Sequence, residues 1–172
     1  MEMEDSLVAE ITGTETIREY LELLKGALEK RKELFQKSIK PGADIVADYC
    51  KAELNNLRVD DTPYIFISQY NKKRGLSQKQ KEGLIKSMGL APLKKKQDGW
   101  DVKLGFDGYN EIRSSKWKNG QPNAMIARSV NKGTSFMVAQ PYMDKTIVAT
   151  EYKAEKAIEQ EFIKIFTEYI KG

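Results

Sequence analysis

Apolar residues along this chain repeat with two periods, one of three to four residues and one of two. The longer period is typical of the buried face of a helix. It begins near Thr16, which has capping-box spacing with Glu19, and it continues to about residue 39. Pro41-Gly42 then interrupts it, so we expect a kink or a break there. A second helical stretch over 43–54 carries Cys50 on its apolar stripe, which predicts a buried rather than a reactive thiol.

The middle of the chain shows both periods in turn. Ser77 and Gln80 have capping-box spacing before a short helix that we expect to stop at Gly89. Apolar and polar residues then alternate over 100–106, which predicts a half-buried strand.

The C-terminal part is predicted to contain two helices separated by a strand. A short helix opens at Pro122 and ends at Gly133, where we expect a left-handed glycine, and 134–139 has the character of a strand. Asp144 is expected to cap the final helix. Its main apolar line consists of Val148, Tyr152, Ile158, Phe162, Ile165 and Tyr169.

Together these elements predict an α+β fold. We expect a small antiparallel or mixed sheet of three to four strands packed against two long helices plus one or two short helices. Residues 7–11 would add a strand, and 64–67 would add another unless they form an extended arm. The chain is predicted to form a single domain over 1–172, with flexible segments at 1–5, 58–76 and 108–121.

The composition is that of a protein with a well-solvated surface. Of the 172 residues, 31% are charged and 40% are hydrophobic. No run of about eighteen apolar residues occurs, so we expect no membrane-spanning helix. The N-terminus is acidic where a secretion signal needs a basic stretch, which predicts synthesis in the cytoplasm. One cysteine cannot form a disulfide within the chain, in agreement with a reducing compartment.

Charge is distributed unevenly along the chain. Between Lys72 and Lys103 there are ten basic and three acidic residues, a local net charge of +7, whereas the first 33 residues hold nine acids and five bases, a net charge of −4. Such polarity can steer head-to-tail association of identical subunits or bring a basic loop close to DNA. A solvated surface with unevenly placed lysines would look the same, so charge alone does not choose between these roles.

Side chains that commonly carry catalysis are scarce. Histidine is absent, so catalysis at neutral pH would need a carboxylate pair, a Ser–Lys arrangement or the single thiol. Ser114-Ser115-Lys116 lies in a polar stretch that offers no desolvation for a lysine base, and Asp60-Asp61 has the character of a turn. We find neither metal-ligand spacing nor a glycine-rich phosphate loop. We therefore expect no enzymatic activity, no catalytic residues, no metal site and no cofactor.

Several short motifs between residue 81 and the C-terminus occur in the same order as in a known protein family. They are the segments 81–92, 102–110, 120–123 and 126–130, followed by Gly133-Thr134-Ser135 and Gln140-Pro141-Tyr142. Together they resemble the tail-component family of tailed bacteriophages, typified by gene product ten of a lambdoid phage. The N-terminal part is similar in layout only. Members often have an acidic residue before the Gly-Thr and Phe after the Pro, where this chain has Asn131-Lys132 and Tyr142.

The resemblance implies a structural virion protein, made in the bacterial host cytoplasm, that acts at the head–tail junction as a neck or tail-completion subunit. Its partners would be copies of itself, arranged in a ring, and neighbouring neck, connector or tail-tube proteins, with no membrane. The alternative is a basic accessory protein that contacts DNA non-specifically, and a hydrolase with an unrecognised carboxylate site is a third class. Candidate interaction residues are Lys72, Lys73, Arg74, Lys94, Lys95, Lys96, Arg128, Thr134 and Tyr142.

Overall fold

The computed structural model of the chain describes residues 14–61, 75–97, 99–113, 115–135 and 137–171. Its helices are α1 (Thr14–Glu29), α2 (Arg31–Asn55), α4 (Gln78–Ser87), α5 (Asn123–Lys132) and α6 (Tyr142–Lys171). Its strands are β1 (Met88–Leu90), β2 (Lys94–Lys96), β3 (Gly99–Asp101) and β4 (Leu104–Phe106). The predicted α+β class is therefore confirmed. The predicted strands at 7–11 and 64–67 lie outside the described residues.

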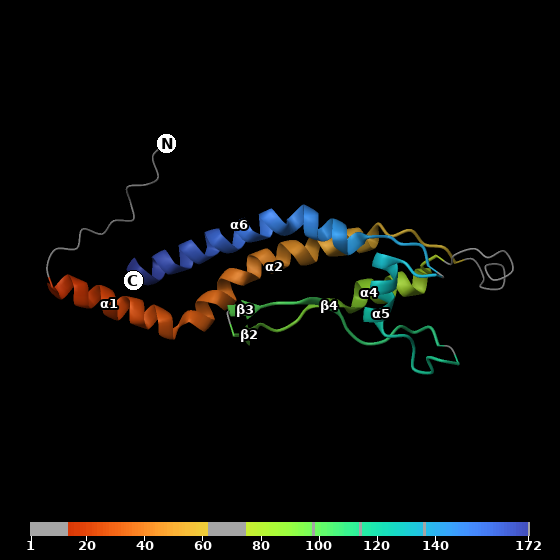
Figure 1. Cartoon of the computed structure of the whole chain (residues 1–172), viewed down its shortest axis with the longest axis horizontal. Coiled ribbons are helices and arrows are strands. Elements are labelled where there is room, and N and C mark those ends of the chain that lie inside the picture. The colour runs from red at the N-terminus through yellow and green to blue at the C-terminus, as the bar shows by residue number, and fades with distance from the viewer. Residues whose placement is uncertain (1–13, 62–74, 98, 114, 136, 172) are drawn as a thin grey trace.

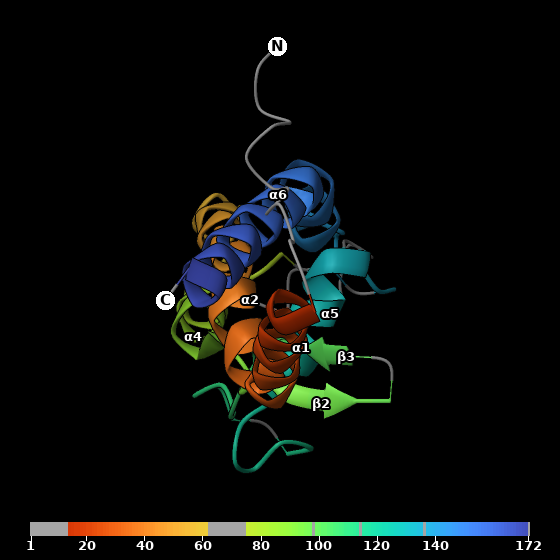
Figure 2. The same ribbon diagram turned by 90° about the vertical axis from the view of Figure 1, so that its left-hand side faces the viewer.

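The molecule is elongated, with two long helices along its axis (Figure 1). α2 and α6 pack side by side and run in opposite directions. The two short helices gather at one end, where α2 ends and α6 begins. The strands lie on the opposite side of α2 from α6, which is also visible along the axis in Figure 2.

Small residues form the contact between α2 and α6. Ser38, Gly42 and Cys50 are buried on α2, and Thr146, Thr150 and Ala154 are buried on α6. A Cβ atom added to Gly42 would lie 2.8 Å from the Ala154 carbonyl oxygen and 2.5 Å from Ile158 Cγ1, so the two backbones approach closely there. The helix hydroxyls do not need partners across the interface, because each donates to a carbonyl oxygen of its own helix. Examples are Ser38 to Leu34 at 2.9 Å and Thr150 to Thr146 at 2.7 Å.

Aromatic side chains pack between the start of α2 and the end of α6. The ring centroids of Phe35 and Phe162 lie 6.0 Å apart, and Phe162 stacks on Phe166 at 5.8 Å. The ammonium group of Lys30 lies 5.5 Å from the centre of the Tyr169 ring. Contacts of this kind are typical of offset and edge-on ring packing. They join the end of α6 to the junction of α1 and α2.

The sequence predicted a kink or a break at Pro41, and the structure shows that the helix does not break there. α2 is continuous from Arg31 to Asn55 with Pro41 inside it. The change of direction lies instead at Lys30, the turn residue between α1 and α2 (Figure 1). Leu34 and Gly42, on either side of Pro41, are both buried, so packing keeps the helix path in spite of the missing N–H donor.

The four strands form two antiparallel two-stranded sheets that follow each other along one ribbon, so the predicted sheet of three to four strands was too large. β1 pairs with β4, with Met88 opposite Phe106, and β2 pairs with β3, with Lys94 opposite Asp101. Pro92 lies where the two ladders separate and can donate no ladder hydrogen bond. We call residues 88–106 the ribbon.

The core lies where α4 and α5 pack against the end of α2 and the start of α6. The capping box of Ser77 and Gln80 is confirmed, with hydrogen bonds of 3.1 and 3.3 Å between their side chains and backbones. Gly89 is not the helix stop, because Ser87 ends α4 and β1 follows at once. The buried apolar residues are Cys50, Leu54, Leu57, Leu76, Leu84, Ile126, Ala127, Val130 and Tyr142.

The segment between α5 and α6 is a folded loop, whereas a strand was predicted at 134–139. Gly133 ends α5 with a positive φ of 71°, as expected of a glycine stop. Thr134 then closes a tight turn, because its N–H donates to the Met137 carbonyl at 3.0 Å while its hydroxyl accepts from Met137 N at 3.0 Å. α6 begins at Tyr142, so Asp144 lies inside its first turn and is not the cap.

Candidate interaction surfaces

Gln140 fixes the loop before α6 against the end of α2. Its side-chain oxygen accepts from Arg58 N at 2.7 Å, and its side-chain nitrogen donates to the Arg58 carbonyl at 3.0 Å. Its own N–H donates to the Val130 carbonyl at 2.7 Å. One side chain thus pairs with the Arg58 backbone as a neighbouring strand would. The residue belongs to the Gln140-Pro141-Tyr142 motif, but its partner lies 82 positions away and cannot be inferred from the motif.

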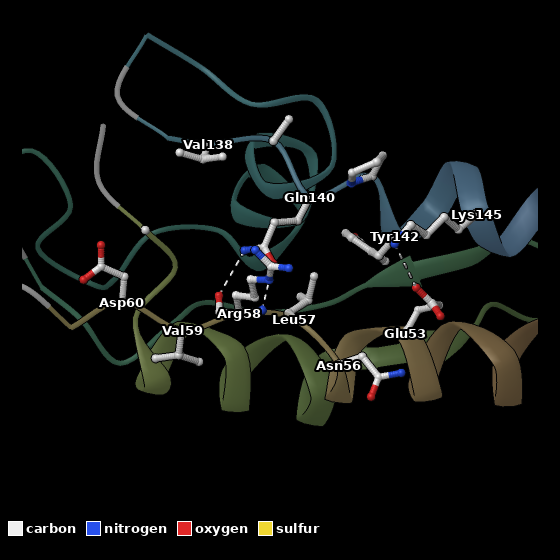
Figure 3. A pocket seen from close by; sticks show the side chains of 13 residues that line it. Glu53, Asn56, Leu57, Arg58, Val59, Asp60, Val138, Gln140, Tyr142 and Lys145 are labelled. Atoms are coloured by element: carbon white, nitrogen blue, oxygen red, sulfur yellow. Dashed lines mark hydrogen bonds and ion pairs between the residues drawn. The ribbon is translucent and has the colours of Figure 1, made fainter. Parts of the chain in front are cut away.

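A cleft of about 510 Å³ opens beside this clamp. Figure 3 shows Arg58, Asp60 and Val138 around it, with Glu53 and Lys145 at the other side. The Lys145 ammonium lies 3.9 Å from a Glu53 carboxylate oxygen, so these charges partly offset each other. The lining mixes acids, bases and apolar groups, and no nucleophile lies against a base. This chemistry fits contact with a polar segment better than binding of one small substrate.

A second cleft of similar size lies between α4, the end of the ribbon and α5. Two buried amides hold its wall: Asn110 donates to the Lys79 carbonyl at 3.3 Å, and Asn123 donates to the Asp107 carbonyl at 2.8 Å. The Asn123 oxygen is buried and has no protein partner in the described part of the chain. These amides anchor the long loop after β4, whose Tyr109 pairs with Pro122 by an isolated bridge.

The ribbon gathers lysines on an exposed arm. Lys94, Lys95, Lys96 and Lys103 are all exposed. Lys96 pairs with Asp101 at 2.8 Å. This hydrogen bond, with the nearby charges of Lys103 and Lys94, lowers the pKa of Asp101 below its ordinary value. In the described part of the arm, one carboxylate therefore faces several cations, and these residues carry excess positive charge.

The outer face of α6 exposes large apolar side chains. Val148 is 82% exposed and Tyr152 is 71% exposed, although both were predicted to lie on the apolar line of this helix. Tyr49 and Pro141 adjoin Val148 in a shallow depression. Buried positions on this part of α6 are taken by Thr146, Thr150 and Ala154, so the predicted apolar line was wrong for its first two residues. Large apolar groups exposed together are typical of contact surfaces.

The predicted interaction residues do not form one site. Lys94, Lys95 and Lys96 make up β2, Arg128 is exposed on α5 and Thr134 is exposed in the following loop. Lys72, Lys73 and Arg74 lie outside the described residues. Tyr142 is 2% exposed, and its hydroxyl donates to the Ala127 carbonyl at 3.4 Å. Burial raises the pKa of Tyr142 well above its ordinary value, and the residue belongs to the core rather than to an interaction surface.

Two further properties concern the described residues only. Their acidic and thiol side chains form no cluster of three or more that could hold a metal ion. Likewise, no described helix has both the length and the apolar character that crossing a bilayer requires.

Comparison of this chain with known protein families, with curated sequences and with solved structures finds no match. Its role must therefore be inferred from its own surfaces.

Proposed function

We propose that this chain is a structural virion protein of a tailed phage or prophage that acts at the head–tail junction through subunit assembly. The observation that supports it best is the outer face of α6, where Val148 and Tyr152 are exposed over consecutive turns. Exposing such side chains to water is unfavourable, and contact with a protein surface would remove that cost. The motifs at 81–92 and 133–142 supply the link to phage tail components.

The elongated form supports an assembly role in a second way. Both ends of the α2–α6 pair are fixed, one by the core around Leu54 and Leu84 and the other by the Phe35–Phe162 contact. A rigid rod of this kind can present separate surfaces to separate neighbours. Ring formation needs such a subunit, because each copy must offer two different patches.

Deleting the gene from the genome that encodes it tests this role. We expect electron micrographs to show filled heads and free tails that are not joined, and infectivity to fall by several orders of magnitude. Supplying the intact gene in trans should restore joined particles. Infectious, normally joined particles from the deletion strain would overturn the proposal.

The lysines of the ribbon favour a second candidate, a nucleic-acid accessory role. A two-stranded ribbon is narrow enough to enter the major groove of DNA, and Lys94, Lys95 and Lys103 lie on it without ion-pair partners in the described structure. Binding would then weaken with salt by a slope of roughly 0.9 for each neutralised phosphate. A DNA titration at several salt concentrations tests this role, and micromolar affinity lost on changing the three lysines to Gln would support it. Binding that these substitutions leave unchanged would contradict it.

A further inference from the structure

The outer face of α6 carries unpaired acidic groups beside its apolar ones. Glu151 and Glu155 flank Tyr152 within one turn. The acids that form ion pairs on this helix are Asp144, Glu159 and Glu161, so Glu151 and Glu155 have no such partner in the described part of the chain. We define the outer face by Val148, Glu151, Tyr152 and Glu155. It combines exposed apolar area with two carboxylates that form no ion pair in the described structure, although the charge of Glu155 also acts on the neighbouring Lys156.

The ribbon has the opposite character. Among the described residues, Lys94, Lys95 and Lys103 are exposed cations that form no ion pair, because the one described carboxylate of the arm, Asp101, pairs with Lys96. Lysine stems are long and apolar, so they can lie on an aromatic ring while their ammonium groups reach a carboxylate. The ribbon thus matches the outer face in both charge and chemistry.

These matching surfaces cannot meet within one chain. Figures 1 and 2 show the ribbon and α6 on opposite sides of α2. Two complementary patches on opposite sides of one subunit are the condition for a heterologous contact, which repeats from copy to copy and closes as a ring if the rotation allows. A single such contact would cover Val148 and Tyr152 and pair the free charges of both surfaces.

We propose that copies of this chain associate head to tail, with the ribbon of one copy docked on the outer face of α6 of the next. This inference rests on the proposed function, because it names the surfaces through which the subunits would assemble. Exposed ion pairs contribute little to affinity individually. Burial of Val148 and Tyr152 would therefore provide most of the affinity, while the charges would select the partner surface and its register.

Charge reversal tests the contact by sedimentation velocity of the full chain at low salt. A ribbon variant carries Lys94→Glu, Lys95→Glu and Lys103→Glu, and a face variant carries Glu151→Lys and Glu155→Lys. We expect the wild-type chain to associate as its concentration rises and each variant to associate at least tenfold more weakly. A chain with all five substitutions has an acidic ribbon and a basic face, so its association should return to within about threefold of wild type.

A matched control makes the same change of net charge as the ribbon variant at other positions. Lys51→Glu, Lys118→Glu and Lys171→Glu alter three exposed lysines outside both surfaces, and this variant should associate like the wild type. Circular dichroism of every variant must show the wild-type helix content. If the chain with all five substitutions does not regain association, the proposed contact is overturned. Loss of association in the face variant alone would also overturn it and point to α6 pairing with itself.

The test separates this inference from the proposed function. A wild-type chain that stays monomeric at the highest concentration reached overturns the head-to-tail contact. Unjoined heads and tails from the deletion strain would still support the head–tail role in that case. Conversely, charge-dependent self-association together with normal particles from the deletion strain would keep the contact and remove the phage role.

Discussion

Replacing Gly42 by Ala tests whether close approach of α2 and α6 determines the stability of the helix pair. Alanine in a helix interior normally stabilises by roughly 1 kcal/mol relative to glycine. Here its Cβ would lie 2.8 Å from the Ala154 carbonyl oxygen, well inside the roughly 3.3 Å of a close carbon–oxygen contact. That oxygen belongs to the backbone of α6 and cannot rotate away, so the helices must separate. Overpacking of this kind costs about 1–3 kcal/mol, and we expect a net loss of about 1–2 kcal/mol.

Urea denaturation followed by far-ultraviolet circular dichroism measures this loss, and at this chain length it corresponds to roughly 2–8 °C in Tm. Gly89→Ala is the matched control, because its added Cβ would meet nothing within 4 Å. It should change stability by less than about 0.5 kcal/mol. Adding Ile158→Ala to the Gly42 variant removes one of the two clashes but leaves Ala154, so recovery should be incomplete. A Gly42→Ala chain as stable as the wild type would refute close packing of the two backbones.

Three further predictions concern local contacts. Gln140→Ala removes both side-chain hydrogen bonds to the backbone after α2 and should destabilise by about 1–2 kcal/mol in the same urea assay; no change would contradict the clamp. Hydrogen bonds from Lys132 and Asn131 lower the pKa of Asp144, so its stabilising effect should be present above about pH 4 and be lost as pH falls through the lowered pKa. Lys132→Ala should raise that pKa toward its ordinary value in an NMR titration, and an unchanged titration would disprove the pairing. Burial raises the pKa of the Cys50 thiol, so a thiol reagent should label it slowly in native buffer and completely in urea; rapid native labelling would contradict its burial.

Local chemistry explains the parts of the fold that the sequence predicted correctly. The Ser77–Gln80 capping box depends on residues three positions apart, so its pattern is complete within one turn. Gly133 ends α5 with a positive φ because glycine adopts that conformation without strain. Cys50 is 0% exposed, as its place on the apolar stripe of the second helical stretch indicated. None of these features needs information from a distant segment.

The incorrect predictions concern contacts between segments that are far apart in the chain. Hydrophobic periodicity ranks Val148 and Tyr152 above Thr146 and Thr150 as core residues, yet the structure buries the two threonines. The α2–α6 contact is close, as the approach of Gly42 to Ala154 shows, and small residues fit such a contact better than large side chains do. Small residues at four-residue spacing on both helices were visible in the sequence. Their meaning depends on pairing the two helices, which periodicity on one helix does not reveal.

The predicted strand at 134–139 failed for a similar reason. Its apolar residues have strand character, but the described residues of this segment form only an isolated bridge, at Met137. The Gln140 side chain already pairs with the backbone of Arg58, and Thr134 folds the intervening residues into a turn. The ribbon also differs from its prediction. Alternation over 100–106 predicted one strand of a larger sheet, whereas the structure has two short ladders that separate at Pro92.

The error on α6 also bears on function. Large apolar residues are usually buried, because leaving them in water is unfavourable. Val148 and Tyr152 satisfy the helical period, but the α2–α6 contact buries the neighbouring stripe and leaves them outside. Because most of their surface stays in water, they contribute little burial to the stability of the isolated chain. Where pattern and structure disagree in this way, the missing partner is best sought outside the chain. The carboxylates beside Tyr152 fit a basic partner, and among the described residues the ribbon of a second copy offers such a surface, which is the basis of the head-to-tail contact proposed above.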